Sequence, residues 1–177
     1  MTRRRATTAP ACNTKTSTYA VDAIASRDAG VLGLVRDERV EILQRPARAH
    51  TLASESDVSG PEALPEVAIV YFHVDADPHI LAYAASNAEG IVVAGAGEGE
   101  GEGAYSQAFS EAIGALDVPV VVSSRVGAGV VDRENLISDN VVAADDLPPQ
   151  EAAVLLRLAL AQGDANQARL EELIATY

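Results

Sequence analysis

Three short apolar runs in the second half of the chain have the pattern of buried β-strands. They are rich in Val and Ile, and each is bounded by Gly, Pro or Asp. An apolar run without polar alternation is typical of a strand covered on both faces, as in a parallel sheet. The predicted strands are residues 67–74, 90–96 and 119–126, with a fourth, shorter one at 140–144.

Helical patterns separate and follow these strands. Phe109, Ile113 and Leu116 recur at helical spacing, and prolines stand where two helices would begin, at Pro78 and Pro148. The predicted helices are residues 78–87, 105–116, a long helix from Pro148, and 166–175. In the long helix the side chains expected to pack on the sheet are Val154, Leu155, Leu158 and Leu160.

The alternation of strand and helix favours right-handed crossovers between parallel strands. We therefore predict an α/β fold, a small parallel four-stranded sheet flanked by helices. Hydrophobic residues make up 48% of the chain, which is enough for a packed core and excludes wholesale disorder.

The chain before residue 67 has a different character. Residues 51–66 are rich in Ser, Pro, Gly and acidic residues without a sustained period, so we interpret them as a linker. Upstream, the apolar runs 31–35 and 40–43, separated by RDER, predict a β-hairpin. Residues 1–50 carry too little apolar surface for a domain of their own, so we interpret them as the end of a larger domain that precedes the domain 67–177.

The formal net charge is -13, and residues 1–50 carry +4 while the remainder carries -17. A surface this negative repels phosphates, so we expect neither a nucleic-acid partner nor a membrane partner. No apolar stretch follows the basic residues 1–5, so we expect no signal peptide and a cytoplasmic protein. The single cysteine, Cys12, excludes an internal disulfide framework and a cysteine-rich zinc site.

Lys15 is the only lysine among 13 basic residues, and the others are all arginine. With the acidic excess, this balance is typical of proteins adapted to concentrated salt. A retained ammonium is suited to proton transfer, which makes Lys15 a candidate catalytic residue, with chance retention as the alternative.

The alternating Gly and Glu run at 97–103 follows a predicted strand but is not a dinucleotide-binding fingerprint. The third glycine of G-x-G-x-x-G is replaced by Glu100, and the carboxylates of Glu98, Glu100 and Glu102 would repel a pyrophosphate. Calcium or magnesium binding is chemically feasible, and a solvated loop is the alternative that we favour. We expect no metal and no cofactor.

Several blocks of sequence resemble the bacterial-type L-asparaginase family, in the family's order and at nearly its spacing. The resemblance extends from about residue 12 to the end of the chain. The blocks are TKTSTYAVDAIASRDAGVLGLV from residue 14, RPARAHT from 45, LPEVAIVYFHVDADP from 64, GIVVAGAGEGEG from 90, VPVVVSSRV from 118 and LPPQEAAVLLRLALAQ from 147.

The resemblance implies a two-domain amidohydrolase that assembles as dimers of tight dimers. Each active site of that family lies between the large domain of one subunit and the flavodoxin-like small domain of its neighbour. This chain matches the C-terminal part, and the family's threonine nucleophile and Thr-Asp-Gly motif have no counterpart in it. We therefore expect family chemistry, the hydrolysis of asparagine to the acid and ammonia with glutamine as a second candidate substrate, but no activity of this chain alone.

The same resemblance suggests site residues. Lys15 matches the family's catalytic lysine. Glu98 or Glu100 stands where the family commonly carries an Asn that reaches across the dimer to the substrate's amino group, in a loop about three residues longer here. Glu134 lies where the family supplies a further substrate-facing acid from the neighbouring subunit.

Other polar residues are weaker candidates. Ser123, Ser124 and Arg125 end a predicted strand, where open α/β sheets place ligands, with loop hydrogen bonding as the alternative. His50, His73 and His79 lack the spacing of metal ligands or of a catalytic pair.

Alternatives to a catalytic homo-oligomer stay open at this point. The chain could be a noncatalytic dimeric binding or assembly module, or a split-enzyme subunit that needs a separate N-terminal half. A third reading is the asparaginase-like subunit of a tRNA-dependent amidotransferase, which the acidic surface and the lack of a tRNA-facing domain disfavour.

Overall fold

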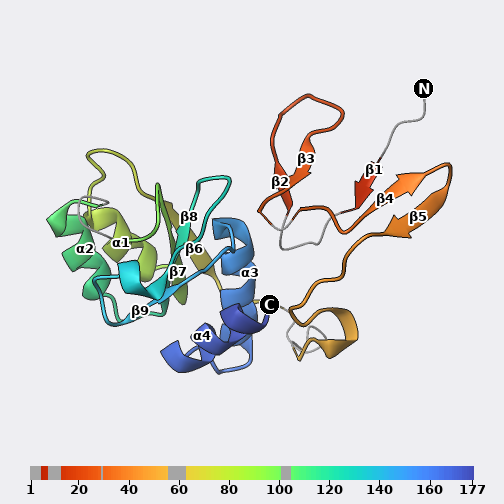
Figure 1. Cartoon of the computed structure of the whole chain (residues 1–177). Helices are drawn as coiled ribbons and strands as arrows, with labels where there is room; N and C mark the ends of the chain where they lie inside the picture. Colours follow the sequence, from red (N-terminus) through yellow and green to blue (C-terminus); the bar gives the residue numbers. More distant parts are fainter. Residues whose placement is uncertain (1–4, 8–12, 29, 56–62, 101–104) are drawn as a thin grey trace. The chain divides into compact units, whose positions relative to one another are not determined.

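The computed structural model describes residues 5–7, 13–28, 30–55, 63–100 and 105–177. The chain divides into two compact units, residues 1–54 with Tyr177, and residues 55–176 (Figure 1). Part of the segment interpreted as a linker, 51–66, lies outside the described residues, so the predicted domain boundaries stay a prediction.

The second unit is built on a four-stranded parallel sheet, as predicted. Its strand order, β6-β7-β8-β9, is the order of the strands along the chain. The strands are β6 Val67–Tyr71, β7 Gly90–Gly95, β8 Val120–Ser124 and β9 Val141–Ala143, and the helices are α1 His79–Ala85, α2 Gln107–Gly114, α3 Pro149–Ala161 and α4 Gln167–Thr176. The α/β fold class is therefore confirmed.

Helices cover both faces of this sheet. Helices α1 and α2 lie on one face and α3 lies on the other (Figure 1). Because successive strand side chains point to opposite faces, Ile91 and Val93 join Phe109 and Ile113 in one core cluster, while Val92 faces the α3 side. The fully buried runs in β7 and β8 explain why the sequence shows no polar alternation there.

The predicted packing face of the long helix α3 is wrong in part. Val154 is 54% exposed, and the buried face is formed by small residues and one leucine. Because alanine has a short side chain, it lets the helix axis approach the sheet closely. A Cβ added at Gly90 would lie 2.9 Å from Leu156 Cδ2, so a larger residue at this position would require the Leu156 side chain to shift. The buried residues of α3 are Pro149, Ala152, Ala153, Leu156 and Ala159.

The first unit consists of short antiparallel strands. They form a three-stranded sheet, order β1-β4-β5, and a two-stranded sheet, β2-β3. The elements are β1 Arg5–Thr7, β2 Asn13–Lys15, β3 Ile24–Ser26, β4 Gly33–Arg36, β5 Arg39–Ile42 and the 3-10 helix η2 Thr51–Ala53. The predicted hairpin is confirmed, and its turn residues Asp37 and Glu38 both have positive φ, as tight hairpin turns require.

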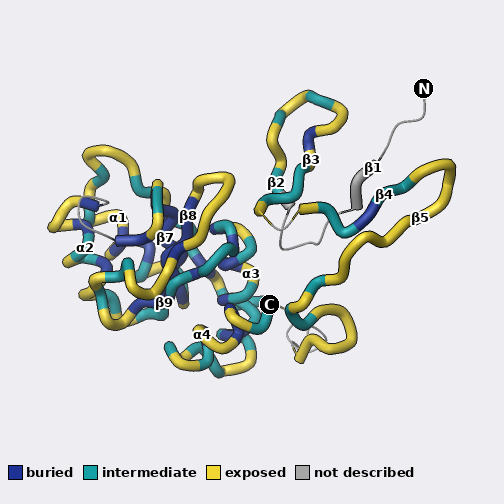
Figure 2. The backbone as a smooth tube through the Cα atoms, viewed as in Figure 1, coloured by how far each residue is buried: buried dark blue, intermediate teal, exposed yellow. Residues whose placement is uncertain are grey.

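This first unit buries little apolar surface. Among its described side chains Ala23 is the only buried hydrophobic one, whereas Tyr19, Val21, Val40 and Leu52 are exposed. Figure 2 shows the contrast: buried backbone is concentrated at β7 and β8, and the hairpin β4–β5 is largely exposed. Burial of apolar surface is the main source of folding free energy, so most of the described core lies in the second unit.

Candidate functional site

The carboxyl ends of the parallel strands meet at one edge of the sheet, where ligands bind in open α/β folds. Arg125, just after β8, links the neighbouring strand ends. Its backbone N–H donates to the Gly95 carbonyl oxygen at 2.9 Å, and its guanidinium Nη1 donates to the Phe72 carbonyl oxygen at 2.7 Å. Arg125 therefore adds two hydrogen bonds to the backbone pairing of the strands at this edge.

The hydroxyls of Ser123 and Ser124 are engaged in loop hydrogen bonds. The buried Ser123 Oγ donates to the Leu147 carbonyl oxygen at 2.6 Å, and Ser124 Oγ accepts from the Val126 N–H at 3.2 Å. These bonds support the structural alternative for both serines.

Glu100 points into the protein. The residue is only 1% exposed. Its Oε2 accepts hydrogen bonds from the backbone N–H groups of Ile137, at 3.2 Å, and Ser138, at 3.1 Å, and its Oε1 accepts from Ser138 Oγ at 3.1 Å. Both carboxylate oxygens are thus occupied by the segment 137–138.

Glu98 and Glu134 are exposed, and they lie on adjoining segments. Glu98 Oε2 accepts a hydrogen bond of 3.4 Å from Nδ2 of Asn135, the residue after Glu134. Glu134 belongs to the 3-10 helix η3 Arg133–Asn135, which Asp132 caps by accepting from the Glu134 N–H. Two solvent-facing carboxylates therefore stand on neighbouring loops of the second unit.

Tyr105 is a buried polar residue beside these loops that the sequence reading did not select. The residue is 8% exposed, and its ring packs against Phe72 and Phe109, with centroid separations of 4.6 and 5.5 Å. Its hydroxyl has no hydrogen-bond partner among the described residues. Burial, and secondarily the charge of Glu100, raises the pKa of Tyr105 well above its ordinary value, so the phenol stays neutral.

Lys15 belongs to the first unit. It ends β2, pairs with Ile24 of β3 and is exposed. The neighbouring Thr16 completes this pairing, because its N–H and its Oγ1 both donate to the Ala23 carbonyl oxygen, at 2.7 and 3.1 Å. Of the four site residues expected from the sequence, Glu98, Glu100 and Glu134 share one unit, and Lys15 lies in the other.

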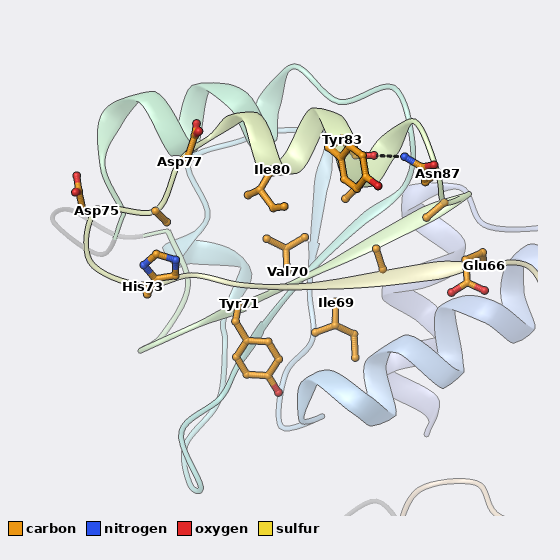
Figure 3. A pocket seen from close by; sticks show the side chains of 14 residues that line it. Glu66, Ile69, Val70, Tyr71, His73, Asp75, Asp77, Ile80, Tyr83 and Asn87 are labelled. Carbon is orange, nitrogen blue, oxygen red and sulfur yellow. Dashed lines mark hydrogen bonds between the residues drawn. The ribbon is translucent and has the colours of Figure 1, made fainter.

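A groove of about 680 Å³ runs between β6 and α1 (Figure 3). Val70, Ile80 and Tyr83 supply apolar walls, and His73 and Asp75 line one end. None of Lys15, Glu98, Glu100 and Glu134 is among its lining residues, so the groove is separate from the loops described above.

The histidines take part in local hydrogen bonds. His50 Nδ1 lies 3.3 Å from Thr51 Oγ1, and His73 Nδ1 lies 2.9 Å from the Val74 carbonyl oxygen. The backbone N–H of His79 donates to Asp77 Oδ1, and its ring Nδ1 lies 2.7 Å from the same oxygen. These contacts with His79 lower the pKa of Asp77.

In the described part of the chain, no three His, Cys, Asp or Glu side chains are grouped so as to hold a metal ion. No helix in the same residues is long and apolar enough to cross a membrane.

Comparison with known proteins assigns the family. The family model for the Glutaminase/Asparaginase C-terminal domain matches residues 66–174, and the chain therefore belongs to this family. The chain is 38% identical over 154 residues to a probable periplasmic L-asparaginase of Haemophilus influenzae and 37% identical over 153 residues to L-asparaginase 2 of Escherichia coli, covering 84% of this chain in both cases.

A solved structure shows the same fold. The crystal structure of a probable cytoplasmic L-asparaginase from Campylobacter jejuni matches with a TM-score of 0.84 and 33% sequence identity, over 96% of this chain and 52% of that chain. The chain spans 44% of the length of the Haemophilus and Escherichia relatives, less than half of either.

Proposed function

We propose that this chain is the C-terminal part of an amidohydrolase that converts asparagine to aspartate and ammonia. The family match over residues 66–174 supports the reaction class, and the relatives named L-asparaginase support the substrate. Glutamine is the second candidate substrate, because a glutaminase-asparaginase of Pseudomonas fluorescens is 33% identical over 136 residues.

Lys15 is the proposed proton-transfer residue of this site. In the hydrolysis a hydroxyl nucleophile attacks the amide carbon, its proton passes to the nitrogen, and ammonia leaves before water releases the acid. An amine near the nucleophile can carry that proton. By the family resemblance the attacking threonine lies in the part of the relatives that this chain does not cover.

Glu98 and Glu134 are the proposed binding residues for the substrate's ammonium group, reaching the active site of a neighbouring subunit. The observation that carries this proposal is the hydrogen bond between Glu98 and Asn135, since it joins the two loops that bear exposed carboxylates. We assign the substrate-facing position to Glu98 rather than Glu100, because both oxygens of Glu100 are already bonded.

A chimera tests the proposed function. The part of the Haemophilus influenzae relative that precedes its match to this chain is fused to residues 13–177, and ammonia release from asparagine and glutamine is measured. The fusion should hydrolyse asparagine, and the Haemophilus piece alone should not. A folded, oligomeric chimera without turnover would contradict the proposal.

A split-enzyme or assembly role is the second candidate. The observation that favours it is the set of exposed apolar side chains in the first unit, including Tyr19 at 92% exposure, because such a surface is usually covered by further polypeptide. The 177-residue chain should copurify with a separately expressed N-terminal half if this role is correct. Ammonia release from asparagine by the pair would then indicate a split enzyme, and its absence would indicate a noncatalytic module.

The assembly and cellular location are also proposals. We propose a homo-oligomer, since Glu98 and Glu134 are proposed to bind substrate across a subunit boundary. We propose a cytoplasmic location, which agrees with the name of the Campylobacter protein, whereas the Haemophilus relative is described as periplasmic.

A further inference from the structure

We propose that Glu100 is a positioning residue whose buried carboxylate fixes the segment 135–138 against the loop after β7, and so determines where Glu134 stands relative to Glu98. The roles of Glu98 and Glu134 in binding rest on the proposed function. The junction between the two loops does not depend on the proposed function, and it can be tested without any enzymatic activity.

The burial of Glu100 shows that its carboxylate belongs to this junction. A carboxylate is almost never fully buried unless its oxygens are bonded, because removing its charge from water is costly. Here three donors compensate: the N–H groups of Ile137 and Ser138 and the Ser138 hydroxyl. Without the carboxylate, two backbone N–H groups would lose their acceptor.

The residues next to Glu100 contact the same segment. The Glu100 N–H donates to the Asn135 carbonyl oxygen at 3.0 Å. Gly99 has φ of +134°, and an added Cβ there would lie 3.2 Å from both the Asn135 carbonyl oxygen and Leu136 Cδ2. With the bond from Asn135 to Glu98, three consecutive residues thus pack against residues 135–138.

In the described part of the chain, the segment that carries Glu134 has further anchors. Leu136 packs against the core cluster of the second unit, and two hydrogen bonds lie near the ends of the segment. The Val131 N–H donates to the Asp145 carbonyl oxygen at 2.9 Å, and Arg133 Nη1 donates to the Ser138 carbonyl oxygen at 3.2 Å. The second bond closes the turn on itself and does not attach it to the loop after β7. The Glu100 contacts therefore orient η3, and with it Glu134, toward Glu98.

Two substitutions separate the contribution of the hydrogen bonds from that of the charge. In Glu100→Gln the side-chain oxygen can still accept from the two backbone N–H groups, and the amide can donate to Ser138 Oγ, so the junction should persist. Glu100→Ala removes the three hydrogen bonds of the carboxylate and leaves the backbone bond from Glu100 to Asn135 in place. Glu111→Ala, on the exposed face of α2, is the matched control for loss of one negative charge.

Two measurements follow these variants. Amide hydrogen exchange at Ile137 and Ser138 is measured in the 177-residue chain, and kcat and KM for asparagine are measured in the active chimera. We expect Glu100→Ala to speed exchange and to raise KM, each by about tenfold or more, with kcat within about threefold. Glu100→Gln and Glu111→Ala should stay close to the unsubstituted protein in both measurements.

Unchanged exchange in Glu100→Ala would overturn the junction itself. Faster exchange with an unchanged KM would overturn the positioning role, as would a KM that rises equally in Glu100→Gln and Glu100→Ala. If the unsubstituted chimera turned over no asparagine, the proposed function would fail instead. In that case the NMR chemical shifts of Glu98 and Glu134 decide the positioning: a change in Glu100→Ala alone supports it, and no change refutes it.

Discussion

The hydroxyl oxygen of Tyr105 occupies the space that a side chain at Gly95 would need. A Cβ built on Gly95 would lie 2.5 Å from that oxygen. The Tyr105 ring packs against Phe72 and Phe109, which also contact each other, so it has little room to swing aside. The carboxyl end of β7 and Tyr105, which lies two residues before α2, are thereby fitted to each other.

Gly95→Ala should destabilise the protein by about 1–3 kcal/mol, because the added methyl overpacks this contact. The double variant with Tyr105→Phe should recover much of the loss, since removal of the hydroxyl frees the space. Urea unfolding of the two single variants and the double variant measures the coupling between the positions. Strictly additive free energies would show that the two residues do not compete for this space.

Tyr105→Phe alone should leave stability near neutral pH unchanged or raise it by about 1 kcal/mol, because the buried hydroxyl has no hydrogen-bond partner among the residues that the structure describes. The contribution of Tyr105 to stability should decrease at alkaline pH. Burial raises the folded-state pKa of Tyr105, so its contribution to stability is complete below the unfolded-state pKa of about 10 and is lost as the pH rises above that value. Unfolding midpoints should therefore fall less steeply on the alkaline side in the phenylalanine variant than in the natural chain.

Lys15→Ala, introduced into the active chimera, should lower kcat by about two to four powers of ten, as expected for loss of a proton-transfer group. Because Lys15 is exposed on β2, its replacement should leave the unfolding midpoint unchanged. A twofold effect on turnover would assign Lys15 to the scaffold.

Stability should increase with salt concentration, because the unscreened carboxylates of a chain with net charge -13 repel one another. Arg169 provides a local test, since its guanidinium contacts Glu55, Asp164 and Glu172 at 2.8, 3.2 and 2.8 Å. Arg169→Gln should steepen the dependence of the thermal midpoint on salt. A midpoint indifferent to salt in both proteins would argue against adaptation to concentrated salt.

The sheet could be predicted from the sequence because its physical cause is local. Uninterrupted apolar runs such as 90–96 identify strands buried on both faces. The helical spacing of Phe109 and Ile113 predicts the helix that connects two of these parallel strands. The packing face of α3 was less predictable. Hydrophobicity alone predicts that Val154 is buried, but the structure buries Ala152 and Ala153 instead. Their small side chains allow α3 to lie close to the sheet, and this advantage depends on tertiary packing that the local sequence does not reveal.

The arrangement of the candidate site depends on contacts between distant residues. Glu98 and Glu100 are two positions apart in a repetitive run, yet one is exposed and the other is buried. Their burial differs because Glu100 accepts a hydrogen bond from Ser138, which is 38 residues further along the chain. The buried Tyr105 hydroxyl is likewise a product of tertiary packing, and neither feature has a local sequence pattern.

Ammonia release from asparagine by the 177-residue chain alone tests the central claim most directly. In the proposed enzyme this polypeptide supplies Lys15 and one wall of the substrate-binding site, while the attacking hydroxyl comes from another part of the complete enzyme. We therefore expect no ammonia release above background from the purified chain, under conditions in which the chimera is active. Sustained turnover by the chain without added polypeptide would contradict that claim.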